Sequence, residues 1–418
     1  MSHLTIHGGK KLNGTVTLQG AKNSALPILA ATLLANGESI IHNCPDITDV
    51  DASLAILCSL GCKCSMSDNT VTVDSSSADK YSISDSLMSE MRSSVIFLGA
   101  MLAVNRKAEL CAPGGCELGL RPINLHIDAF RRMGADIKEQ HGRLICVAEN
   151  GLCGTTVDLP VASVGATENI MIAATTAKGD TVIRNAAKEP EICDLANYLR
   201  ACGANISGDG TTVITISGVK SLHPAEYNVI PDRIVAATFL SAAAICGGDV
   251  YISGANENHL ISVLPCFEQM GCAVISDSGG IRIKSSGNIS RLGTVRTAEY
   301  PGFPTDAQPV LLAASCVANG TSIFVENIFS NRFRYVSELI KMGARISVLD
   351  RVAVVDGVPM LTSAKLNATD LRGGAAMVIA ALKASGVSDV YSIEHIERGY
   401  ENIEQSFSNL GADIKKES

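Results

Sequence analysis

The cysteine in the segment CAPGGCELGLRP is the side chain best placed in this sequence for covalent or proton-transfer chemistry. The proline and glycines around it predict a mobile surface loop, with Cys116 at its crown and Arg121 opening the helix that follows. A nearby cation can tune the pKa of a thiol for proton transfer, and the chemistry could also be nucleophilic or redox. The alternative is that Cys116 is one more buried thiol among fourteen cysteines, but a glycine-rich tip buries little surface.

Charged and polar residues gather where six apolar helices are predicted to begin. They are Lys22 and Asn23 in the first helix, Arg92 in the second, Ser163 before the third, Asp232 and Arg233 in the fourth, Asp306 in the fifth, and Asp370 and Arg372 in the sixth. Serine and aspartate are ordinary helix caps, and this structural role stays open for Asp306 and Asp370. It does not explain the cations, which the helix dipole disfavours at that end by about 0.3–1 kcal/mol. The pattern predicts an anionic ligand in a cleft where the helix starts of two domains converge.

A short motif containing glycine recurs six times and sets the organisation of the chain. Its glycines are Gly61, Gly134, Gly203, Gly271, Gly343 and Gly411, separated by 73, 69, 68, 72 and 68 residues. Each follows a helical pattern and precedes an alternating strand pattern. Glycine there is predicted to end the helix in the left-handed region.

The small-residue helices keep the same period, as in GATENIMIAATTA and DRIVAATFLSAAAI. A glycine turn and a β-rich stretch follow most of them, but the second is followed by NRKAELCAP. Helices that are apolar on nearly every face are buried. Each repeat therefore has strands, one surface helix and one buried helix, and six repeats predict two pseudo-threefold α/β domains.

Composition excludes several classes of protein. Hydrophobic residues are 46% and charged residues 18%, as in globular proteins. A net charge of −8 and 4% aromatics argue against binding to nucleic acid or to an anionic membrane. The N-terminus has no apolar leader, no apolar run spans a bilayer, and Cys62 and Cys64 lack a second pair for zinc. We expect a cytoplasmic, reduced protein without metal or cofactor.

Many segments together resemble the UDP-N-acetylglucosamine enolpyruvyl transferase family in order and spacing. They are GAKNSALP, MRSSVIFLGAMLA, APGGCELGLRP, SVGATENIM, NAAKEPEICDLANYLRACGA, YPGFPTDAQ, ENIFSNRFRYVSEL, ATDLRGGAA and HIERGYENIE. The resemblance runs across essentially the whole chain and includes the loop cysteine. It implies two inside-out α/β barrels of three repeated units each. The first domain would span 22–229 and carry the cysteine loop (about 111–122), the second would comprise 1–21 and 230–418, and the active site would lie in the interdomain cleft.

The resemblance also implies an activity, the first committed step of peptidoglycan precursor synthesis. The enolpyruvyl group of phosphoenolpyruvate would pass to the 3′-hydroxyl of UDP-N-acetylglucosamine by addition and elimination, with release of phosphate. These two small molecules are the implied partners. Neither a cofactor nor an obligate protein partner is implied.

Residue roles are carried over by match to the family's motifs. Cys116 would be the proton donor, and Asp306 would face the sugar hydroxyl as base or aligner. Lys22, Arg121 and Arg398 would clamp phosphoenolpyruvate, with Asn23, Asp370 and Arg372 nearby. The positions that would hold the UDP-sugar are Arg92, Arg121, Pro122, Ile123, Asn124, Leu125, Ser163, Val164, Gly165, Ile328 and Arg332.

Two departures from the family and three rival hypotheses accompany this assignment. Position 124 is Asn where many members carry Asp, and the segment 158–162 lacks a Lys that some members have. The nearest rival is an enolpyruvylshikimate-phosphate synthase-like enzyme, whose corresponding loop places no cysteine at the proton-donor position. The second is an inactive paralogue that binds nucleotide sugar or a regulatory protein. The third is an RNA-end-processing enzyme, which the net charge argues against.

Overall fold

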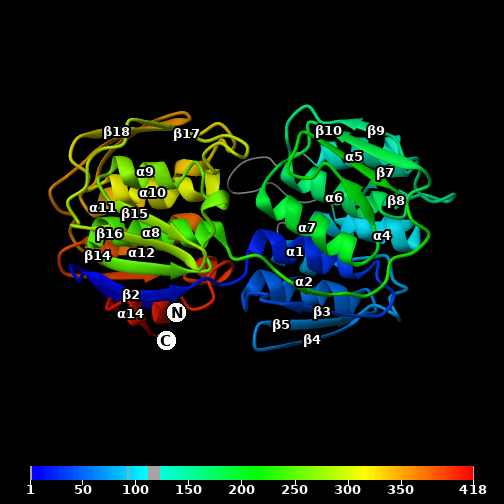
Figure 1. The fold of residues 1–418 in the computed structure, drawn as a ribbon, viewed down its shortest axis with the longest axis horizontal. Coiled ribbons are helices and arrows are strands. Elements are labelled where there is room, and N and C mark those ends of the chain that lie inside the picture. The colour runs from blue at the N-terminus through cyan, green and yellow to red at the C-terminus, as the bar shows by residue number, and fades with distance from the viewer. Residues whose placement is uncertain (1, 92–93, 112–122, 418) are drawn as a thin grey trace. The chain divides into compact units, whose positions relative to one another are not determined.

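The computed structural model describes residues 2–91, 94–111 and 123–417. The described chain divides into two compact units, drawn in Figure 1. The first unit holds the described residues between 20 and 230, and the second holds 2–19 and 231–417. The two chain termini therefore belong to the same unit, and the chain leaves it after residue 19 and returns at residue 231.

The first unit contains seven α-helices, one 3-10 helix and eleven strands among its described residues. In chain order they are α1 (Lys22–Thr32), β3 (Glu38–His42), α2 (Thr48–Ser59), β4 (Lys63–Ser67), β5 (Thr70–Asp74), α3 (Asp85–Glu90), η1 (Ser94–Ile96), α4 (Phe97–Asn105), β6 (Lys107–Cys111), α5 (Asn124–Arg132), β7 (Asp136–Gln140), β8 (Arg143–Val147), β9 (Thr156–Asp158), α6 (Val164–Ala174), β10 (Asp180–Arg184), α7 (Pro190–Ala201), β11 (Asn205–Ser207), β12 (Val213–Ser217) and β13 (Glu226–Asn228).

The second unit begins with the two N-terminal strands and continues after residue 230. Its elements are β1 (His3–His7), β2 (Leu12–Thr17), α8 (Arg233–Cys246), β14 (Gly248–Ser253), η2 (Glu257–His259), α9 (Leu264–Gln269), β15 (Ala273–Asp277), β16 (Gly280–Ser285), β17 (Thr294–Arg296), η3 (Thr305–Ala307), α10 (Gln308–Ser315), β18 (Thr321–Val325), η4 (Arg332–Tyr335), α11 (Val336–Lys341), β19 (Arg345–Leu349), β20 (Val352–Asp356), β21 (Lys365–Asn367), α12 (Leu371–Lys383), β22 (Val387–Tyr391), α13 (Glu394–Glu397), α14 (Ile403–Asn409) and β23 (Asp413–Glu417).

The described strands form three sheets in each unit, and the sheets share one pairing pattern. The first unit has the orders β13-β3-β5-β4, β6-β8-β7 and β11-β12-β10-β9, and the second has β21-β22-β1-β23, β15-β16-β14-β2 and β17-β18-β20-β19. Each four-stranded sheet has one parallel pair at an edge and antiparallel pairs elsewhere. In the three-stranded sheet, a single parallel bridge from Ser82 to Glu109 takes the place of the parallel edge pair. This is the α/β fold that the sequence predicts.

The six repeated glycines end six helices, as predicted. Each lies between a helix and a strand, from α2 and β4 to α14 and β23, and each has a positive φ between 87° and 105°. A side chain would strain that backbone. The second repeat departs after its buried helix, where no glycine is available. Arg106 takes the left-handed conformation there at the end of α4, with φ 57°.

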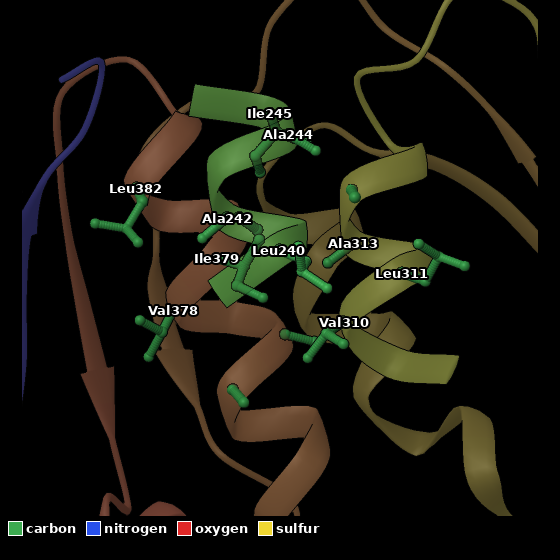
Figure 2. Close-up of a cluster of buried hydrophobic side chains, with 14 of the residues drawn as sticks. Leu240, Ala242, Ala244, Ile245, Val310, Leu311, Ala313, Val378, Ile379 and Leu382 are labelled. Carbon is green, nitrogen blue, oxygen red and sulfur yellow. The ribbon is translucent and has the colours of Figure 1, made fainter. Parts of the chain in front are cut away.

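The helices predicted to be buried form the interiors of the two units. In the second unit α8, α10 and α12 contact one another pairwise, and Figure 2 shows Leu240, Val310 and Ile379 in the core between them. In the first unit α1, α4 and α6 also contact one another. Alanine-rich faces let such helices approach closely, so the surface of each core helix is covered almost completely.

Two cysteines illustrate the role of the buried thiols among the described residues. Cys246 in α8 and Cys316, which caps the end of α10, are both buried in the second core. Burial raises the pKa of each thiol to about 12, so both act as small apolar side chains, as the sequence predicts. Among the described residues, no helix is both long and apolar enough to cross a membrane.

Candidate functional site

Four residues of the predicted site lie outside the described residues: Arg92, Cys116, Arg121 and Pro122. Their roles therefore stay predictions. The other predicted residues divide between the two units. Those from Lys22 to Gly165 belong to the first unit, and those from Asp306 to Arg398 belong to the second.

Lys22 is the first residue of α1, and its partner is a carboxylate of the same unit. Its Nζ lies 2.6 Å from Oδ2 of Asp49 in α2, and the two side chains are only 9% and 3% exposed. The Asp49 carboxylate thus offsets the charge of Lys22, for which the sequence alone showed no counter-charge at the start of the helix. Two residues further into α1, the Ser24 hydroxyl donates to the Asp194 carboxylate, which also accepts from the Tyr227 hydroxyl. Burial raises the pKa of Asp194, despite these bonds.

Asp306 lies between two buried arginines of the second unit. Nη2 of Arg332 is 3.1 Å from Oδ1 of Asp306 and 2.8 Å from the Thr305 carbonyl oxygen. Nε and Nη2 of Arg372 are both 3.3 Å from Oδ2. Arg332 is 1% exposed and Arg372 2%, whereas the Asp306 side chain is 28% exposed. The arginines therefore fix a carboxylate that still faces solvent.

The environment of Arg372 keeps it charged. Burial lowers the pKa of its guanidinium, but the attraction of Tyr400, Asp306 and Asp232 outweighs burial and leaves the pKa above its ordinary value. Arg332 was predicted to hold a UDP-sugar. Its guanidinium bonds Asp306 and the Thr305 carbonyl oxygen and lies 5.8 Å from the centre of the Phe329 ring, and its role toward the UDP-sugar stays a prediction.

The capping alternative is settled differently for the two aspartates. Asp370 is the N-cap of α12, and its Oδ1 accepts from the backbone N–H groups of Arg372 and Gly373. Asp306 is not the N-cap of η3, because Pro304 occupies that position and Asp306 lies inside the short helix. Its side chain bonds the two arginines. Asp370 thus has the structural role that the sequence left open.

Glu326 is a fully buried carboxylate that sequence analysis did not select. Its Oε1 accepts from the backbone N–H groups of Ile328 at 2.9 Å and Phe329 at 3.0 Å. The Thr305 hydroxyl lies 3.1 Å from both of its carboxylate oxygens. Glu326 therefore joins the segment of Ile328, which is 36% exposed, to the segment of Asp306.

The remaining predicted residues occupy helix ends. Ile123 caps α5, with Asn124 exposed in its first turn. Ser163 caps α6, where its hydroxyl accepts from the Ala166 N–H at 3.3 Å. Arg398 is the C-cap of α13, at the end of the helix where the dipole favours a cation.

Glu168, a buried glutamate in the first unit, is expected to make the stability of the fold depend on pH. Burial, and then the charges of Glu191 and Glu189, raise the pKa of Glu168 well above its ordinary value. The folded chain therefore keeps a proton that the unfolded chain releases above about pH 4.5, so this group costs stability as the pH rises. Glu168→Gln should raise the melting temperature more at pH 8 than at pH 5. An equal change at both values, measured by thermal unfolding, would show that Glu168 is already ionised.

The first unit has a buried ammonium group at Lys22, and the second has the Asp306 carboxylate held by two buried guanidinium groups. Such groups bind and orient anions and hydroxyls, and stabilise charge that develops in a reaction. In the part of the chain that the structure describes, no group of three or more His, Cys, Asp or Glu side chains is arranged to hold a metal ion.

Comparisons with known proteins place the chain in a family. Residues 6–407 match the EPSP synthase (3-phosphoshikimate 1-carboxyvinyltransferase) family. UDP-N-acetylglucosamine 1-carboxyvinyltransferase 2 of Caldanaerobacter subterraneus subsp. tengcongensis is 48% identical over 99% of this chain and 99% of its own. UDP-N-acetylglucosamine 1-carboxyvinyltransferase of Clostridium botulinum is 45% identical over 99% of each chain.

A solved structure has the same fold. The enolpyruvyl transferase NikO from Streptomyces tendae is similar with a TM-score of 0.90 and 26% identity, over 99% of this chain and 98% of that chain. The family match and the relatives agree on the type of enzyme. This chain therefore belongs to the EPSP synthase family of enolpyruvyl (1-carboxyvinyl) transferases, and within it to the UDP-N-acetylglucosamine 1-carboxyvinyltransferases.

Proposed function

We propose that this enzyme transfers the enolpyruvyl group of phosphoenolpyruvate to the 3′-hydroxyl of UDP-N-acetylglucosamine. The observation that carries the proposal is the 45–48% identity, over nearly the full length, to relatives named for that acceptor. The EPSP synthase-like alternative is not favoured, because that name is carried by the wider family and by solved structures that are only 20% identical to this chain. The free thiols buried in both cores favour a reducing, cytoplasmic setting.

The chemistry divides into addition and elimination. The Cys116 thiol donates a proton to the methylene carbon of phosphoenolpyruvate, and the sugar 3′-oxygen then forms a bond to C2 as its hydroxyl proton is removed. Elimination breaks the bond from C2 to the phosphate oxygen and returns a proton from the methyl carbon to the Cys116 thiolate. The proton of the sugar hydroxyl leaves on the released phosphate. Lys22, Arg121 and Arg398 neutralise the phosphate and the carboxylate, so no metal is needed for charge balance.

Asp306 has the role of orienting the attacking hydroxyl. The Asp306 side chain is 28% exposed, and the two buried arginines hold its carboxylate in place, so the carboxylate can face a substrate hydroxyl. Whether Asp306 also takes the proton is decided by the kinetics of its variants. We assign Arg332 and Arg372 to positioning Asp306.

The finer architecture is also part of the proposal. We infer that each unit is an inside-out barrel of three repeats, with sheets outside and the core helices inside. The support is the three sheets of each unit, their shared pairing pattern and the pairwise contacts of the core helices. The predicted domain boundaries, 21/22 and 229/230, lie beside the divisions at 19/20 and 230/231. The active site is proposed to use residues of both domains.

A phosphate-release assay tests the proposed function. Purified protein with phosphoenolpyruvate and UDP-N-acetylglucosamine should release phosphate continuously. The same protein with phosphoenolpyruvate and shikimate 3-phosphate should not. Turnover with shikimate 3-phosphate alone would overturn the choice of acceptor, and turnover with neither would favour an inactive binding protein.

Replacement of Glu326 should reduce activity without removing a catalytic group. In Glu326→Gln one acceptor becomes an N–H donor, which leaves a buried donor near Thr305 or Ile328 without its bond, at a cost of about 1–3 kcal/mol. The expected result is a fall in kcat/KM for the acceptor of about tenfold or more. Glu338→Gln is the matched control, because Glu338 accepts from the Asn367 N–H and from Lys341 in the same unit. It should lower the melting temperature with little change in kinetics, and an equal kinetic loss in both variants would contradict the assignment.

A further inference from the structure

Three cysteines gather at the end of α2 in the first unit, and none of them belongs to the site described above. Cys58 lies in the last turn of the helix and is exposed. Cys62 follows the helix and is buried, and Cys64 is half-buried in β4. In the sequence, Cys62 and Cys64 lack a second pair of ligands for zinc, and the folded chain does not arrange the three thiols to hold a metal ion.

Backbone hydrogen bonds at the end of α2 turn the chain back toward the helix. The Gly61 N–H donates to the Cys58 carbonyl oxygen at 3.1 Å, and the Cys62 N–H donates to the Leu57 carbonyl oxygen at 3.0 Å. With the positive φ of Gly61, 105°, these two bonds form a Schellman motif. β4 therefore starts beside the last turn of α2, and the two elements pack together.

The Cys58 thiol acts on both of the other thiols. Cys62 and Cys64 are two residues apart, so their side chains point to the same face of the extended chain, the face that packs on the core of the first unit. Burial, and then the charges of Cys58 and Asp74, raise the pKa of Cys62 to about 12. Burial, and then the charge and the side-chain hydrogen bond of Cys58, raise the pKa of Cys64. Cys64 is therefore the thiol that Cys58 contacts.

We propose that Cys58 and Cys64 form a modification site, at which a peroxide oxidises the two thiols to a disulfide. Cys58 reacts first, because it is exposed and the Cys64 thiol stays protonated at neutral pH. The Cys58 sulfur takes one oxygen as the O–O bond breaks, which gives a sulfenic acid and one water. The Cys64 sulfur then bonds to the Cys58 sulfur as the S–O bond breaks, and a second water leaves. The two thiols lose two electrons and two protons, and the peroxide takes up both.

The surroundings of the pair suit a small oxidant. β4 is an edge strand of its sheet, in the order β13-β3-β5-β4, and Cys58 is open to solvent. The Schellman motif already holds Cys58 and Cys64 close together, so the bond closes a short ring without unfolding α2. In a reducing setting both thiols return to the free form, and the bond therefore marks exposure to peroxide. Neither thiol takes part in enolpyruvyl transfer, so this inference does not depend on the proposed function.

Digestion with trypsin identifies the bond in the unaltered protein. Trypsin cuts after Lys63, so Cys58 falls in the peptide that ends there and Cys64 begins the next peptide. After treatment with hydrogen peroxide, alkylation of the remaining thiols and digestion without reductant, the two peptides should be joined, and dithiothreitol should separate them. Cys153, an exposed thiol of the same unit, is the internal control and should join no other peptide. Two separate peptides, or Cys153 joined as often as Cys58, would overturn the proposal.

Single substitutions show which two sulfurs carry the bond. After the same treatment the two peptides should stay separate in Cys58→Ala and in Cys64→Ala, and should still be joined in Cys62→Ala. A joined pair that persists in Cys58→Ala, or that is lost in Cys62→Ala, would assign the bond to another thiol and overturn the proposal. Fragment masses of the joined peptides from the unaltered protein make the same assignment, so the result stands even where a variant fails to fold.

Discussion

Asp306→Asn is expected to lower kcat by about a hundredfold to ten-thousandfold, with a small change in the KM for phosphoenolpyruvate. Asparagine keeps the shape of the side chain but loses the charge that bonds Arg332 and Arg372. The attacking hydroxyl then loses the carboxylate that orients it. Steady-state kinetics with each substrate varied in turn measures the effect.

The comparison with Asp306→Glu separates alignment from loss of charge. Glutamate keeps the charge but shifts the carboxylate by one methylene, so a strict requirement for position predicts a large loss in this variant as well. Asp356→Asn is the control, since Asp356 is an exposed carboxylate of the same unit that accepts from the Thr321 hydroxyl. A kcat of Asp306→Asn within threefold of the unaltered enzyme would remove Asp306 from the reaction.

Cys116→Ala should abolish turnover to a similar extent while UDP-N-acetylglucosamine still binds. Loss of a general acid typically costs about a hundredfold to ten-thousandfold, because the methylene carbon of phosphoenolpyruvate then has no proton donor. Isothermal titration measures binding and phosphate release measures turnover. Full activity in Cys116→Ala would show that another group protonates the substrate.

A chemical label makes the same point without a kinetic comparison. The epoxide antibiotic fosfomycin should add once to the unaltered enzyme at Cys116, as measured by intact mass and peptide mapping. Cys111→Ala is the matched control, because Cys111 is five positions earlier and its Sγ lies 3.6 Å from the Gly142 carbonyl oxygen. It should still be labelled. An unmodified Cys116 at saturating fosfomycin would contradict an accessible, reactive thiol.

The fold was largely predictable because its signals are local and repeated. Gly134 illustrates the signal, since an amphipathic helix comes before it and an alternating strand after it. The buried helices follow from their composition alone. The pairing within the second repeat was less predictable, because Arg106 replaces glycine in the left-handed region and the parallel edge strand shrinks to the Ser82 bridge.

The electrostatic partners in the site could not be predicted from residue types. Lys22 and Asp49 lie on different helices, and Asp306 and Arg372 come from different repeats, so only the folded chain brings them together. Asp49 lies in the first turn of α2, where an acidic residue is common because it interacts favourably with the helix dipole. Its position in the sequence therefore gives no sign of a partner in another helix. Glu326 directly follows a strand and has no spacing that identifies it. Helix caps were easier to predict, because Asp370 accepts from a backbone N–H only two residues further along the chain.

Product identification in a mixture of the two candidate acceptors tests the central claim most directly. The enzyme would receive limiting phosphoenolpyruvate with equal amounts of UDP-N-acetylglucosamine and shikimate 3-phosphate, and mass spectrometry with proton NMR would locate the vinyl ether. The account predicts an enolpyruvyl ether on the 3′-oxygen of UDP-N-acetylglucosamine, with one phosphate released per product. An ether on the shikimate, or unchanged UDP-N-acetylglucosamine after all phosphoenolpyruvate is consumed, would contradict it.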